Sequence, residues 1–62
     1  MTIEKLNKSY TVFSDSNEKI GTFQLDSDNL YYFWINDNTP GCWSAYDLSE
    51  IAKLLDNINK QI

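Results

Sequence analysis

The middle of the chain reads Leu30-Tyr31-Tyr32-Phe33-Trp34-Ile35, six consecutive apolar residues of which four are aromatic. Aromatic and β-branched residues favour strands, and a run this short is too small for an independent helix. Because side chains alternate between the two faces of a strand, this strand is apolar on both faces. That pattern is typical of a strand covered on both sides. The stretch therefore predicts a strand over residues 30–35 at the centre of a small sheet.

Two further strands are expected before this one. Residues 10–14 are rich in aromatic and β-branched residues, and residues 20–25 contain a second apolar run. In that second run Ile20 has the opposite parity to the other large apolar residues. Gly21 beside it predicts a β-bulge that restores the register.

Polar turns separate the expected strands. Residues 15–18 and 26–29 consist of Asp, Ser, Asn and Glu, which favour tight turns because their side chains bond to the local backbone. Short strands joined by tight turns predict an antiparallel meander over residues 10–36. The mostly polar residues 1–9 form either a loose arm or a fourth, edge strand.

A capped amphipathic helix is expected over residues 44–60. Ser44 and Asp47 have the spacing of an N-terminal capping box. Apolar residues then recur at spacings of three and four, as in one helical stripe: Leu48, Ile51, Leu55, Ile58 and Ile62. Leu54, at the margin of the stripe, either widens the core or joins a contact surface. The expected fold class is α+β, a three-stranded antiparallel meander with a fourth strand if residues 1–9 pair, packed against one C-terminal helix.

Size and charge narrow the classes of function. The 62 residues make one domain, and such a small domain buries only about 60% of its unfolded surface. Five lysines, no arginine and nine acidic residues give a net charge of −4, which argues against binding a phosphate backbone. A single Cys, no signal sequence and no apolar run near the ~20 residues of a membrane helix predict a cytoplasmic protein without a membrane span.

The residues expected of an active site are missing from the sequence. His is absent, so a nucleophilic Cys42 would have no base beside it, and its simpler role is a small apolar residue next to Trp43. The segment Asp26-Ser27-Asp28 begins like a calcium loop, but Leu30 stands where a ligand belongs. We therefore expect a non-catalytic protein without a metal or another cofactor.

The aromatic sheet is the first candidate binding site, because one short helix covers only one of its faces. Exposed apolar patches mark interfaces, and Tyr and Trp often carry their binding energy. The candidate partner-binding residues are Tyr31, Tyr32, Phe33, Trp34, Ile35, Trp43 and Leu54. The free face is covered by the N-terminal arm, by a second copy in a homodimer or higher oligomer, or by a different protein. Base stacking is disfavoured because basic residues are scarce.

Two alternatives to a protein-blocking function remain open. The acidic surface residues Asp15, Glu18, Asp26, Asp28 and Asp37 can imitate DNA phosphates and occupy a nucleic-acid-binding protein. Turns also favour Asp for backbone reasons, which explains most of these residues without a partner. The other alternative is a homo-oligomer that sequesters a small ligand against Trp34 or Trp43.

The closing stretch, residues 41–59, resembles the ends of small accessory proteins of tailed bacteriophages. It combines the step Trp43-Ser44 with a helix that contains Glu50-Ile51-Ala52 and finishes near Leu55-Asp56-Asn57. With the meander before it, the resemblance covers roughly the last two-thirds of the chain. It implies a protein made in the host bacterial cytoplasm during infection. Such a protein would inhibit host defence by binding and blocking a host protein, or would sequester a small signal molecule.

Overall fold

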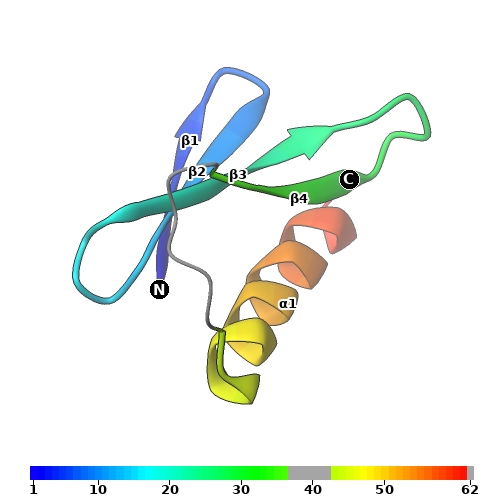
Figure 1. Cartoon of the computed structure of the whole chain (residues 1–62). Coiled ribbons are helices and arrows are strands. Elements are labelled where there is room, and N and C mark those ends of the chain that lie inside the picture. The colour runs from blue at the N-terminus through cyan, green and yellow to red at the C-terminus, as the bar shows by residue number, and fades with distance from the viewer. Residues whose placement is uncertain (37–42, 62) are drawn as a thin grey trace.

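The computed structural model describes residues 1–36 and 43–61. Within these ranges, four strands form one antiparallel sheet and one helix follows them. The elements are β1 (Thr2–Leu6), β2 (Ser9–Phe13), β3 (Lys19–Leu25), β4 (Tyr31–Ile35) and α1 (Ala45–Lys60). The strands lie side by side in chain order, with α1 on one side of the sheet (Figure 1). The α+β prediction, with its fourth N-terminal strand, is therefore confirmed.

Within the first nine residues, β1 forms an edge strand in place of a loose arm. Ile3 pairs with Val12, and Glu4 pairs with Thr11. The chain reverses at Asn7, whose φ of 56° is the left-handed conformation that Asn tolerates better than most residues. β1 extends the sheet at the edge opposite β4, so it does not lie over either face of β4.

β4 lies at an edge of the sheet, so the prediction of a central strand over residues 30–35 is wrong. β3 pairs with one side of β4. On the other side, the side-chain amide of Asn59 bonds to Tyr31: its Oδ1 accepts from the backbone N–H at 2.7 Å, and its Nδ2 donates to the carbonyl at 3.2 Å. The strand is apolar on both faces although one face stays exposed, at Tyr32 and Trp34.

The predicted bulge in the second strand of the meander is confirmed. Val12 pairs with Gly21, but the next residue of β2, Phe13, pairs with Lys19. Ile20 is therefore an extra residue in β3, and this shift lets its side chain enter the core despite its sequence parity.

The helix begins with the predicted capping box. The Ser44 hydroxyl accepts from the backbone N–H of Asp47 at 3.1 Å, and the Asp47 carboxylate accepts from the backbone N–H of Ser44 at 3.3 Å. These bonds satisfy amide groups that the helix itself leaves unpaired, and they fix the start of α1. Ile62, the last member of the predicted stripe, lies outside the described residues.

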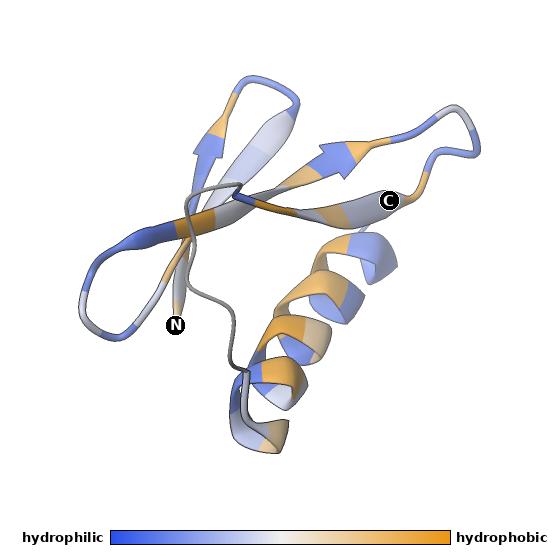
Figure 2. Cartoon of the chain, in the orientation of Figure 1, coloured by the Kyte–Doolittle hydropathy of each residue, from blue (hydrophilic) through white to orange (hydrophobic). Residues whose placement is uncertain are grey.

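The buried side of α1 is rotated relative to the predicted stripe. Ile51 and Ile58 are buried, and Leu54 and Leu55 are half-buried against the core, whereas Leu48 is 55% exposed. At 100° per residue, Leu48 and Leu54 lie on opposite margins of the stripe, so a helix that turns one inward turns the other out. Figure 2 shows the hydrophobic side of α1 turned towards the sheet.

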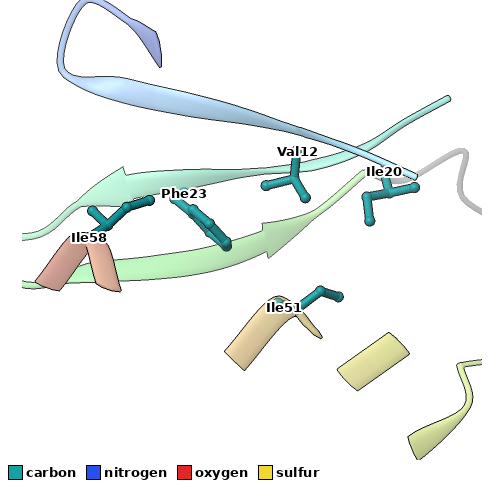
Figure 3. Packing of buried hydrophobic residues seen from close by; sticks show 5 residues of the cluster. All are labelled: Val12, Ile20, Phe23, Ile51 and Ile58. Carbon is teal, nitrogen blue, oxygen red and sulfur yellow. The ribbon is translucent and has the colours of Figure 1, made fainter. Parts of the chain in front are cut away.

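The core lies between the sheet and α1. Its buried members are Val12, Ile20, Phe23, Ile51 and Ile58. Side chains from β2 and β3 point towards Ile51 and Ile58 of α1 (Figure 3). A core this small leaves the domain marginally stable, so each contact between the sheet and α1 matters for the free energy of unfolding.

Candidate protein-binding surface

The sheet face opposite α1 carries the exposed aromatic side chains of β4. Tyr32 is 44% exposed and Trp34 is 59% exposed. Leu30, just before the strand, has the parity of these two residues and is exposed as well. Ile35, at the end of the strand, is also exposed, although it has the parity of Tyr31 and Phe33. We call the group Leu30, Tyr32, Trp34 and Ile35 the β4 patch. The structure thus places most of the free apolar surface of the sheet on one edge strand.

Tyr31 and Phe33 belong to the opposite face and serve the fold. The ring of Tyr31 meets that of Tyr10 edge-on, with centroids 5.5 Å apart. The ring of Phe33 meets that of Phe23 in the same way at 5.8 Å. Both side chains are half-buried beside the core, so the two expected binding residues offer little free surface.

Trp43 and Leu54 also pack against the core. Both are half-buried hydrophobic residues in contact with the buried cluster. Of the two roles considered for Leu54, the structure therefore supports the one in which it widens the core. Neither residue adds to the exposed aromatic face of β4.

Polar side chains of β3 lie beside the β4 patch, and the sequence interpretation missed them. Trp34 stands opposite Thr22, and Tyr32 stands opposite Gln24. The Gln24 Nε2 donates to the Thr22 Oγ1 at 2.9 Å. Residues directly opposite one another in an antiparallel pair lie on the same face, so the alternation of side chains along the two strands would have identified both Thr22 and Gln24. The aromatic rings thus have a polar border that can supply hydrogen bonds to a partner.

A shallow pocket of about 320 Å³ opens beside Trp34. Its lining residues are Lys19, Gly21, Thr22, Gln24, Trp34, Ile35 and Asn36. Lys19 is the one charged residue in this lining, and within residues 1–36 and 43–61 no carboxylate forms an ion pair with it. The pocket combines an indole wall, amide and hydroxyl groups and a single cation. It can accept a flat side chain, a carboxylate or a small anionic ligand.

A hydrogen bond holds the ring of Tyr32 in place. Its hydroxyl donates to Oδ2 of Asp28, and the backbone N–H of Leu30 donates to Oδ1 of the same carboxylate at 3.0 Å. These bonds, that of Tyr32 foremost, hold the pKa of Asp28 below its usual value. The same hydrogen bond raises the pKa of the Tyr32 phenol.

The predicted acidic residues do not form one patch in the described part of the chain. Asp15 and Glu18 lie in the turn between β2 and β3, and Asp26 and Asp28 lie in the turn between β3 and β4. These turns are at opposite ends of β3, so the sheet separates the two pairs. Asp37 lies outside the described residues. A DNA-like row of charges therefore gains no support from the described residues.

Residues 1–36 and 43–61 contain no group of three or more His, Cys, Asp or Glu side chains placed to hold a metal ion. Cys42 lies outside the described residues. Among the described residues, no helix has the length and apolar character needed to cross a membrane.

Comparisons with known proteins leave this surface as the basis for interpreting function. No family model, no curated protein and no solved structure matches the chain.

Proposed function

We propose that the protein is a non-catalytic interaction domain that binds another protein through the β4 patch and blocks it. The observation that supports this is the concentration of exposed large apolar side chains on β4 and its flanks. Aromatic anchors surrounded by polar groups are the usual composition of a protein interface. Thr22 and Gln24 supply such polar groups beside Trp34 and Tyr32.

The proposed partner is a protein of a bacterial host. This part of the proposal rests on the resemblance of residues 41–59 to phage accessory proteins, which also suggests a cytoplasmic location and a role against host defence. The apolar character of the β4 patch favours contacts that persist at high salt, because salt screens charges and does not weaken apolar burial.

A matched pair of variants tests the proposal. The double variant Tyr32→Ser with Trp34→Ser removes the two exposed rings of β4. The control, Tyr46→Ser with Leu48→Ser, removes two side chains of similar exposure from α1. Each tagged protein is used to capture partners from bacterial lysate, with washes at low and high salt.

We expect one host protein to be retained by the wild type and the control at both salts. The β4 variant should lose it, since truncating an aromatic anchor costs about 2 kcal/mol or more, roughly 30-fold in affinity. Circular dichroism should show that both variants stay folded. Capture that survives in the folded β4 variant would exclude this surface. Capture lost only at high salt would point to the acidic turns instead.

A second candidate function is the sequestration of a small ligand, which the pocket beside Trp34 favours. The lone Lys19 makes a ligand with an anionic group and a flat ring the best match for this lining. An empty capture experiment with a folded wild-type protein would favour this candidate over a protein target.

A further inference from the structure

The outer edge of β4 carries backbone groups that are free to pair with another strand. Toward β3, the even-numbered residues make the hydrogen bonds: Leu30 accepts from Asp26 at 2.9 Å, and Asn36 donates to Ile20 at 2.8 Å. In an antiparallel pair, the alternate residues point their N–H and C=O groups away from the neighbour. The backbone N–H and C=O groups of Tyr31, Phe33 and Ile35 therefore point away from β3, towards the open edge of the sheet.

Of these three residues, Tyr31 is the one whose outward backbone groups bond to Asn59. The side-chain amide of Asn59 pairs with both backbone groups of Tyr31, as a neighbouring strand would. Among the residues that the structure describes, none bonds to the outward N–H and C=O of Phe33 or Ile35. Unpaired groups on an edge strand act as a template for another strand.

The two edges of the sheet differ in how they are protected. β1 carries the charged residues Glu4 and Lys5, and charge on an edge strand discourages pairing. β4 has no charged residue, no proline and no bulge. Its exposed side chains, Tyr32, Trp34 and Ile35, are aromatic or aliphatic and carry no charge. The β4 edge is therefore the one suited to strand addition.

We propose that a second copy of the chain pairs with this edge, β4 against β4, around a two-fold axis at Trp34. Only this antiparallel register lets both free residues pair reciprocally, Phe33 of each copy with Ile35 of the other. Registers that use Tyr31 compete with Asn59. The acidic turn at Asp26 and Asp28 precedes β4, so the two copies of that turn lie on opposite sides, far from the axis.

The pairing would join two sheets into one and bring the exposed aromatic faces together. Trp34 would stand directly opposite its own copy, with Cα atoms about 4.5 Å apart, as in a pair without mutual hydrogen bonds. Ile35 would pack beside Phe33 of the second copy. The inference goes beyond the proposed blocking function and is tested with purified protein alone, so its failure would leave the host-protein proposal standing.

The first test compares the oligomeric state of two variants, each with a lysine on one of the two edges of the sheet. Ile35→Lys places a cation on the β4 edge, and Leu6→Lys places one on β1, where Leu6 is 62% exposed. Light scattering over micromolar to millimolar concentration should show a dimer for the wild type and for Leu6→Lys. Ile35→Lys should remain a monomer with an unchanged circular dichroism spectrum. A wild type that stays monomeric, or a Leu6→Lys variant that alone dissociates, would overturn the proposal.

The second test fixes the register. In a Cys42→Ser background, Trp34→Cys should form a disulfide-linked dimer under mild oxidation, because its Cα separation lies in the bonding range of about 4.4–6.8 Å. Tyr32→Cys should not, since the two copies of residue 32 would be offset by about 13 Å along the strands. Equal cross-linking of the two variants would contradict the register, whatever the light scattering shows.

Discussion

At the scale of single residues, the environment of Tyr32 shows how a turn fixes part of the binding surface. Asp28 was considered as an acidic contact residue, yet its carboxylate accepts bonds from the Tyr32 hydroxyl and the Leu30 amide. The turn therefore uses this charge internally, to hold an exposed ring in one position. A ring held in place loses less conformational entropy on binding than a free one.

The hydrogen bond between Tyr32 and Asp28 leads to a pH prediction. The lowered pKa of Asp28 means that its contribution to stability is present above the unfolded pKa of about 3.9 and is lost as pH falls through the folded pKa. Tyr32→Phe removes the largest cause of that shift, so the pKa of Asp28 should rise towards its usual value. An NMR titration of the side-chain carboxyl resonance measures this. An Asp28 titration unchanged by the substitution would show that the hydroxyl does not bond to this carboxylate in solution.

At the scale of elements, Asn59 joins the last turn of α1 to the free edge of β4. It makes two hydrogen bonds to the backbone of Tyr31, with Oδ1 as acceptor and Nδ2 as donor. We expect Asn59→Ala to destabilise the domain by about 1–3 kcal/mol, since each such bond contributes roughly 0.5–1.5 kcal/mol. Urea denaturation followed by circular dichroism gives the change in unfolding free energy.

Asn57→Ala is the matched control for this substitution. Asn57 is an exposed residue of the same helix, and Ala has the higher helix propensity, so the control should be neutral or slightly stabilising. Equal effects of the two substitutions would mean that the bond to Tyr31 adds nothing to stability.

The elements themselves were largely readable from the sequence, whereas the position of residues 30–35 in the sheet was not. Turn residues, strand composition and the Ser44 to Asp47 capping box are local signals, and each predicted its element. Whether a strand apolar on both faces is central or lies at an edge depends on what covers the second face. That covering surface is no part of the local pattern, so the sequence predicted a central strand.

The local pattern also did not show which aromatic residues would be exposed. The alternation along residues 30–35 divides their side chains into two sets, but it does not show which set packs against α1. That choice depends on the bulge at Ile20 and Gly21, which sets the register of β3. Gly21 also permits the close approach of β4, because a Cβ at this position would lie 2.6 Å from Cε1 of Phe33. Only the assembled sheet shows that Tyr32 and Trp34 are the exposed pair.

At the scale of the whole molecule, a small core and an open edge are linked. Within residues 1–36 and 43–61, the buried cluster consists of five residues of β2, β3 and α1, and these ranges leave apolar surface of β4 exposed. Domains of this size often gain stability from self-association. If β4 pairs with β4, folding and assembly become coupled, and stability should then depend on protein concentration.

Thermal unfolding measures that coupling independently of size or cross-linking. For a protein that unfolds from a dimer, each tenfold rise in concentration adds about 1.4 kcal/mol per dimer. For a domain this small, we expect the wild-type midpoint to rise by about 3–6 °C per tenfold increase. The midpoint of Ile35→Lys should stay constant, because a monomer unfolds without a change in particle number. A wild-type midpoint that also stays constant would mean that the core between the sheet and α1 stabilises the fold on its own.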